Sequence, residues 1–160
     1  MIYAPLYVFH FPYSQPRGLT EAQRFLFENP DPDKLCRTAD KLRYYRYTNA
    51  LLQREVADHA NIDRTTYIHY EMVLDYYPLD KLTRIADLFQ IEVTDLLDDY
   101  NKFLFDGQGR QIRTIRKNLQ MTQTVFAAFI GVQPGTVKRW ESEYMRISKW
   151  KWEDLIKIGG

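Results

Sequence analysis

Apolar residues recur three or four positions apart along most of the chain after residue 20, which is the spacing of one face of an α-helix. One such stripe consists of Leu35, Ala39, Leu42 and Tyr45. We expect its helix to begin at Asp31-Pro32, since Asp is a good N-cap and Pro fits a first turn. Thr20 and Gln23 have capping-box spacing, which predicts a short helix before it. The pattern predicts an all-α protein.

The segment at the N-terminus, 1–18, differs from the rest of the chain. Apolar and aromatic residues alternate there, which predicts a short extended strand interrupted by Pro5, Pro12 and Pro16. A single strand is not stable alone. This segment must therefore lie over the helices, pair with another chain or remain loose.

A five-residue framework occurs twice, at a constant offset and without insertion or deletion. Its members are Arg46, Gln53, Ala57, Thr66 and Glu71, followed by Arg116, Gln123, Ala127, Thr136 and Glu141. An internal repeat defines the unit of architecture. Each copy places Asn61 or Gly131 between two predicted helices, and these residue types readily adopt the left-handed conformation of a tight turn. Each copy is therefore predicted to be a helix-turn-helix.

The repeat divides the chain into four parts. Residues 1–31 form an N-terminal segment with a strand and a short helix, and residues 32–100 form the first helix-turn-helix domain. Residues 101–109, which contain Gly107 and Gly109, are interpreted as a linker. Residues 110–160 form a second, shorter domain with one closing helix. We therefore expect two tandem domains joined by a flexible connection.

Charge is distributed unevenly, although the net charge of the chain is only +1. Residues 41–100 contain seven Lys/Arg and eleven Asp/Glu, whereas residues 101–160 contain eleven Lys/Arg and five Asp/Glu. Such asymmetry indicates a polyanion partner for the basic part or simply a solvated basic face. Charge alone leaves both interpretations open.

Several classes of function have little support in the sequence. The single Cys36 excludes an intramolecular disulfide and fits a reducing compartment, and the chain has no apolar run of membrane-spanning length. His10, His59 and His69 lack metal-ligand spacing, and no phosphate-binding glycine loop is present. We therefore expect a cytoplasmic protein that is not an enzyme, with no catalytic residues, metal or cofactor and no association with a membrane.

The order of residues in each copy is similar to a known pattern. The first copy contains, in order, Arg46, Leu51-Leu52-Gln53, Val56-Ala57, Asn61-Ile62, Thr65-Thr66-Tyr67 and Tyr70-Glu71. The second contains Arg116, Met121-Thr122-Gln123, Phe126-Ala127, Gly131-Val132, Thr136-Val137 and Trp140-Glu141. Both resemble the phage repressor/Cro family of helix-turn-helix regulators, also called the xenobiotic-response-element type. The first copy departs from the family at Leu52, where Thr or Ser is usual, and at Asn61, where Gly is usual.

The resemblance implies a function and a set of site residues. In this family the third helix enters the DNA major groove, so the resemblance implies a repressor-like transcriptional regulator of bacterial, phage or mobile-element type that binds double-stranded DNA sequence-specifically. The implied DNA-binding residues of the first copy are Gln53, Arg64, Thr65, Thr66 and His69. Those of the second copy are Gln123, Thr124, Gln133, Gly135, Thr136, Lys138 and Arg139. Gly135 has no side chain to read a base, so Lys138 and Arg139 would carry specificity there.

Two further expectations accompany the resemblance. Arg46 and Glu71 have the same separation in sequence as Arg116 and Glu141, and we interpret both pairs as buried structural ion pairs rather than DNA contacts. The acidic first copy with its apolar Ile68 leaves an alternative open: a protein-interaction module, such as an antitoxin-like protein. In that case residues 1–31 would provide the contact for a homodimer or a partner protein.

Overall fold

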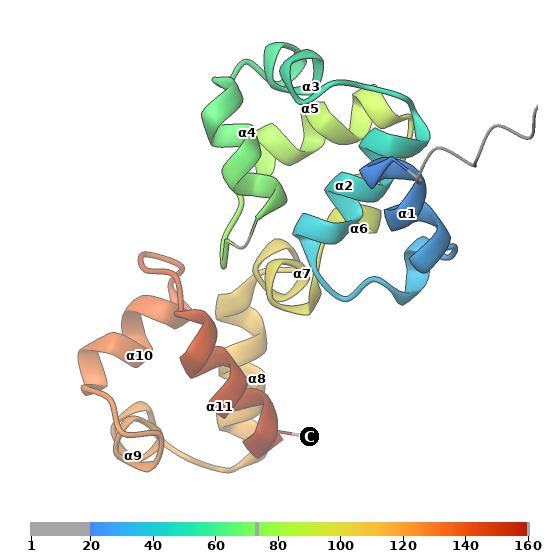
Figure 1. Cartoon of the computed structure of the whole chain (residues 1–160). Coiled ribbons are helices and arrows are strands. Elements are labelled where there is room, and N and C mark those ends of the chain that lie inside the picture. Colours follow the sequence, from blue (N-terminus) through green and yellow to red (C-terminus); the bar gives the residue numbers. More distant parts are fainter. Residues whose placement is uncertain (1–19, 73, 160) are drawn as a thin grey trace, which may run out of the picture.

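The protein is described from a computed structural model, which describes residues 20–72 and 74–159 (Figure 1). Within these ranges the chain forms eleven α-helices and one 3₁₀ helix, and no β-strand. The predicted all-α class is confirmed. The strand predicted within residues 1–18 lies outside the described residues. None of the described helices is long and apolar enough to cross a membrane.

The first part of the chain folds into six α-helices and the 3₁₀ helix. Their bounds are α1 (Glu21–Glu28), η1 (Pro32–Lys34), α2 (Thr38–Thr48), α3 (Gln53–Ala60), α4 (Arg64–Glu71), α5 (Leu79–Phe89) and α6 (Val93–Leu96). The capping box predicted for α1 is present, because the side chains of Thr20 and Gln23 each accept from the other's backbone N–H.

The continuous helix predicted from Asp31-Pro32 is wrong. Asp31 caps only the single turn of η1, and the backbone is extended at Leu35 and Arg37 before α2 starts. This break buries Leu35 and lets the hydroxyl of Thr38 accept from the buried backbone N–H of Asp98 at 3.0 Å. Satisfying a buried donor from a distant segment outweighs the local preference for a continuous helix.

The second part of the chain forms the remaining five helices. Their bounds are α7 (Asp99–Phe105), α8 (Gln108–Asn118), α9 (Gln123–Phe129), α10 (Pro134–Glu141) and α11 (Lys149–Gly159). Four of them repeat the first part, since α2, α3, α4 and α5 precede α8, α9, α10 and α11 respectively by the offset of the sequence repeat. The repeat therefore includes the closing helix of each unit.

The tight turn of each helix-turn-helix has the predicted backbone conformation. Asn61 (φ 53°) and Gly131 (φ 69°) are both left-handed. The next residue closes each turn, because the N–H of Ile62 donates to the Ala57 carbonyl at 3.0 Å and that of Val132 to the Ala127 carbonyl at 2.8 Å. The two turns are thus equivalent despite their different residues.

Each unit has its own hydrophobic core. The buried core of the first unit consists of Leu42, Val56, Ala57, Ala60, Tyr67, Tyr70, Tyr77, Leu82, Ile85, Ala86, Phe89, Leu96 and Leu97. That of the second unit consists of Tyr100, Phe103, Ile112, Phe126, Ala127, Ile130, Val137, Trp140, Ile147 and Leu155. We therefore refer to residues 20–97 as the first unit and residues 98–159 as the second unit.

The structure differs from the predicted linker at residues 101–109. Most of that segment is helix α7, whose Tyr100 and Phe103 are buried in the second core. Gly107 (φ 85°) makes the turn into α8, and a Cβ on Gly109 would lie only 2.6 Å from the Glu141 carbonyl oxygen. The two glycines therefore serve a sharp turn and a close helix contact rather than a flexible hinge.

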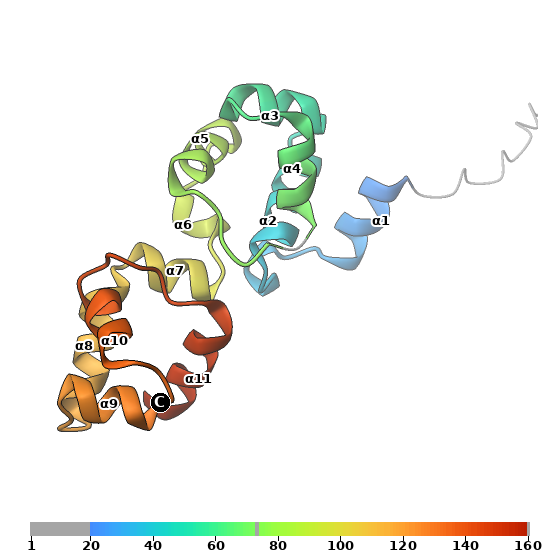
Figure 2. The same cartoon turned by 90° about the vertical axis from the view of Figure 1, so that its left-hand side faces the viewer.

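Helix α7 begins the second unit and also contacts the first (Figure 1). The side-chain amide of Asn101 donates to the Asp75 carbonyl at 3.1 Å and accepts from the Tyr77 N–H at 3.3 Å. The guanidinium of Arg146 lies 3.6 Å from the ring centroid of Tyr76. In Figure 1, α4 and α10 lie on the left-hand side of their units, and Figure 2 turns that side toward the viewer.

The packing of α7 gives a test with a control on the same helix. Phe103 is 6% exposed, whereas Phe105 is 41% exposed. We expect Phe103→Ala to lower the free energy of unfolding of the second unit by about 3–5 kcal/mol. We expect Phe105→Ala to lower it by about 1 kcal/mol or less. Denaturant unfolding followed by tryptophan fluorescence measures both, because all three tryptophans lie in this unit. Equal small effects of the two changes would mean that α7 is a linker after all.

Candidate nucleic-acid interface

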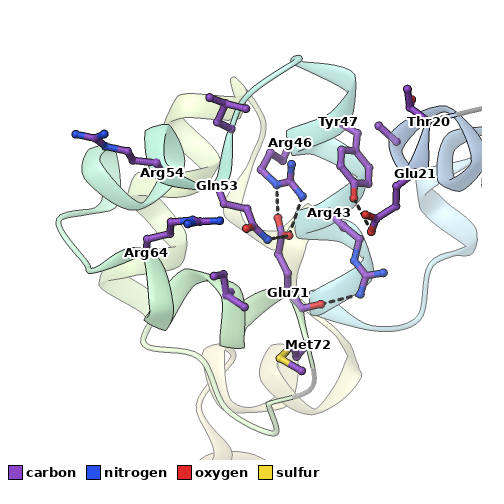
Figure 3. A pocket seen from close by; sticks show the side chains of 13 residues that line it. Thr20, Glu21, Arg43, Arg46, Tyr47, Gln53, Arg54, Arg64, Glu71 and Met72 are labelled. Carbon is purple, nitrogen blue, oxygen red and sulfur yellow. Dashed lines mark hydrogen bonds and ion pairs between the residues drawn. The ribbon is translucent and has the colours of Figure 1, made fainter.

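A buried ion pair joins three helices of the first unit. Arg46 on α2 makes a bidentate contact with Glu71 at the end of α4, with one of its two bonds at 2.8 Å. Gln53 at the start of α3 donates to the same carboxylate at 2.9 Å. Figure 3 shows Arg46 and Gln53 converging on Glu71 at the floor of a groove. The arrangement holds α4 against its two neighbours.

The second unit contains the same arrangement at the equivalent positions of the repeat. Arg116 on α8 donates to Glu141 at 2.6 and 3.1 Å, and Gln123 on α9 donates to Glu141 at 2.8 Å. Arg113 adds a contact of 3.5 Å to the same carboxylate. Burial opposes ionisation of Glu141, but hydrogen bonds from Arg116 and Gln123 outweigh it and lower the pKa of Glu141 below its ordinary value.

These contacts bear on the role predicted for the two glutamines. Gln53 and Gln123 are half-buried, and the amide nitrogen of each donates inward to a glutamate. In this arrangement each glutamine orients the ion pair. The family resemblance implies that both glutamines bind DNA, because each stands at the start of the second helix of its copy. The position of a residue in the sequence does not show the inward hydrogen bond.

Helix α4 presents a mixed surface. Arg64, Thr65 and His69 are exposed along it, and Ile68 is half-buried between them. Thr66 differs from Arg64, Thr65 and His69. It is half-buried, and its hydroxyl donates to the Asp63 side chain at 2.5 Å as part of the helix cap.

Helix α10 presents a more basic surface. Lys138 and Arg139 are exposed on it, and nothing lies within 4 Å of the space that a Cβ on Gly135 would fill. The predicted residues Thr124 on α9 and Gln133, the N-cap position of α10, are also exposed, whereas Thr136 is half-buried. A ligand can therefore approach the backbone of α10 closely at Gly135.

Further basic residues lie beside the end of α10. Arg110, Arg113 and Lys117 of α8 are exposed and line a hollow of about 390 Å³, whose lining also includes Glu141, Ser142 and Glu143 at and after the end of α10. Their spacing of three and then four positions puts them on one face of a helix. They are not among the site residues that the family resemblance implies, although their spacing is visible in the sequence.

We also searched the described residues for a metal site. Among them, no group of three His, Cys, Asp or Glu side chains is placed to hold a metal ion. The basic surface of the second unit can instead form charge-assisted hydrogen bonds to phosphate oxygens.

The comparison with known families supports this interpretation of the second unit. Residues 112–155 match the family model described as Helix-turn-helix. The matched residues run from Ile112 within α8 to Leu155 within α11, so they include all of α9 and α10. The match supports DNA binding, and the family is one of DNA-binding domains rather than enzymes. No curated protein and no solved structure gives a significant match.

The buried Glu141 predicts a specific pH dependence of stability. Because its folded-state pKa lies below the ordinary value of 4.5, its contribution is present above pH 4.5 and is lost as the pH falls through the folded-state pKa. We expect Glu141→Gln to lower the free energy of unfolding by about 3 kcal/mol at neutral pH, since Arg116 loses its counter-charge. Denaturant unfolding between neutral pH and pH 3 should show this difference narrowing below pH 4.5.

The exposed Glu153 on α11 provides a matched control in the same unit. Glu153→Gln makes the same chemical change and should leave the unfolding curve nearly unchanged at every pH. A difference between wild type and Glu141→Gln that stays constant down to pH 3 would contradict a lowered pKa of Glu141 in the folded state.

Proposed function

We propose that this protein is a repressor-like transcriptional regulator that binds double-stranded DNA sequence-specifically through its second unit. The single observation that carries the proposal is the surface of α10. Lys138 and Arg139 are exposed there on a helix-turn-helix framework, next to the basic hollow on α8. The family match over residues 112–155 supports the same unit.

The proposed roles follow from the chemistry of each side chain. Arg139 reads a base, because a guanidinium pairs bidentately with guanine in the major groove, and Lys138 donates to a base or a phosphate. Arg113 and Lys117 contact phosphates, which positions the helix but does not read sequence. The open space at Gly135 lets the α10 backbone approach the groove.

The first unit is a weaker candidate for reading DNA. It contributes an exposed Arg64, Thr65 and His69 on α4, but its surroundings are net acidic and Ile68 is apolar. The exposed apolar Leu52 and Met72 beside that helix favour a second candidate function for this unit, namely contact with protein rather than with DNA. A chain with one reading unit would bind an asymmetric site unless two chains assemble on it.

Selection of bound duplexes from a random pool by the full chain tests the proposal and supplies a target for the measurements below. Enrichment of a shared sequence is the expected outcome. Failure of the wild-type chain to enrich any duplex would contradict sequence-specific binding.

Removal of Arg139 should weaken binding to the selected duplex. We expect Arg139→Ala to cost about 1–3 kcal/mol of binding free energy and to relax the preference at one base position. Fluorescence anisotropy with matched and single-mismatch duplexes measures both quantities. His69→Ala, at the equivalent position of the first unit, should leave affinity unchanged. Arg84→Ala on α5 removes one exposed charge and controls for net charge. The opposite ranking of Arg139→Ala and His69→Ala would assign reading to α4.

The salt dependence of binding tests the basic hollow separately. Each phosphate contact releases counterions, so the logarithm of affinity should fall with the logarithm of salt concentration with a slope of roughly −0.9 per contact. We expect Lys117→Ala to weaken binding to all duplexes alike and to reduce the slope by about one contact. An unchanged slope in this variant would place the phosphate backbone elsewhere on the protein.

A further inference from the structure

The first unit has a groove at the place where the second unit presents its basic surface. The groove has a volume of about 650 Å³ and runs between α1, α2, α3 and α4 (Figure 3). Its lining includes the apolar Leu52, Ile68 and Met72, of which Leu52 is 67% and Met72 is 59% exposed. Exposed apolar side chains gathered in one groove indicate a site that something covers.

The apolar lining is a specific difference between the two copies. At the equivalent positions the second copy has polar or charged residues in place of each apolar or aromatic one. The pairs are Tyr47 and Lys117, Leu52 and Thr122, Ile68 and Lys138, and Met72 and Ser142. The helices around these positions repeat with the same offset, so this helical fold forms without apolar residues there. We therefore attribute the apolar residues to a contact made in the groove.

Helix α1 forms one wall of this groove. The hydroxyl of Tyr47 donates to Glu21 at 3.1 Å, and the rings of Phe25 and Tyr47 are in edge contact with centroids 5.7 Å apart. The guanidinium of Arg43 lies over the Phe25 ring at 5.3 Å. Residues 91–98, which stand at the positions equivalent to α1, form α6 and the connection to α7 instead. The groove therefore depends on an element that belongs to the first unit alone.

We propose that the chain's own residues 1–19 occupy this groove. The segment joins the described chain at Thr20, which itself lines the groove, so its attachment point lies at the site. A tethered segment meets an adjacent site at a high effective concentration, which favours it over a second chain. A segment of this length is ample to fold back across four helices, since each extended residue covers about 3.3 Å.

The aromatic residues of the segment match the apolar part of the groove. Residues 1–19 contain Tyr3, Tyr7, Phe9, Phe11 and Tyr13, and among Asp, Glu, Lys and Arg they contain only Arg17. The groove offers apolar contacts at Leu52 and Met72 and the guanidinium groups of the exposed Arg54 and Arg64. Guanidinium groups bind favourably over aromatic faces, and aromatic rings also cover exposed apolar side chains.

Occupation of the groove has a consequence for the two units. A segment held against Ile68 and Arg64 lies between α4 and any DNA duplex, whereas α10 has no such cover from this segment. The first unit then acts as the docking site for the N-terminus, and reading of DNA falls to the second unit. The docking itself does not depend on the proposed DNA binding.

Paramagnetic relaxation in the full-length chain tests the docking directly. A nitroxide is attached to Val8→Cys in a Cys36→Ser background, since Cys36 is the single native cysteine and is exposed. Because the tether gives an effective concentration of millimolar order, we expect roughly twofold or greater loss of amide peak intensity at Leu52, Ile68 and Met72. The amides at the equivalent positions Thr122, Lys138 and Ser142 should keep their intensity.

Two controls make the result decisive. Leu52→Thr with Met72→Ser introduces the residues of the second copy at exposed positions, and should restore the lost intensity while the other amide peaks report an intact fold. The second control mixes two proteins: isotope-labelled protein that carries no nitroxide, and protein that carries the nitroxide but no isotope label. The amide peaks of the isotope-labelled protein should keep their intensity in this mixture. Broadening in the mixture would replace the proposed contact by one between chains. Equal broadening in both units, none in either, or persistence in the double variant would overturn the proposal. No DNA is present, so this outcome is independent of the proposed function.

Discussion

The rest of the structure depends on one interaction, the buried contact of an arginine and a glutamine with a glutamate. A carboxylate removed from water must be compensated by charge and hydrogen bonds, and an arginine and a glutamine from two other helices provide this for Glu71 and for Glu141. The requirement holds together α2, α3 and α4 in the first unit and α8, α9 and α10 in the second. Because the contact is internal, the outer faces of α4 and α10 are left free to change.

The two copies differ in the chemistry of that outer face. Around α10 the surface is basic and open, with Lys138 and Arg139 exposed beside the arginines of α8. Around α4 the position of Lys138 is taken by the apolar Ile68, the exposed apolar Leu52 and Met72 lie nearby, and α1 adds a wall. A single scaffold thus carries two surfaces of different chemistry, and the helix α7 joins them through buried contacts on one side and Asn101 on the other.

Much of this fold was predictable because its signals are local. The capping pair Thr20 and Gln23 and the left-handed residues Asn61 and Gly131 act within a few positions of themselves, so their conformations follow from short stretches of sequence. The break before Thr38 and the helical character of residues 101–105 were not predictable in this way. The hydroxyl of Thr38 accepts a hydrogen bond from the backbone N–H of Asp98, which is distant in sequence. Phe103 is buried in a core to which other helices of the second unit contribute, and the local sequence does not show that core.

The features of the candidate site can likewise be separated into those that are local in sequence and those that depend on helix packing. By itself, the sequence determined that a helix-turn-helix pattern occurs twice, that basic charge collects in the second half, and that Lys138 and Arg139 lie on the last helix of the second pattern. Only the tertiary structure decided that Gln53 and Gln123 hydrogen-bond inward, that three basic residues of α8 lie beside α10, and that Leu52, Ile68 and Met72 share a groove with α1. The reason is physical: periodicity assigns a side chain to a face of its own helix, whereas the neighbours of that face are set by how the helices pack against one another.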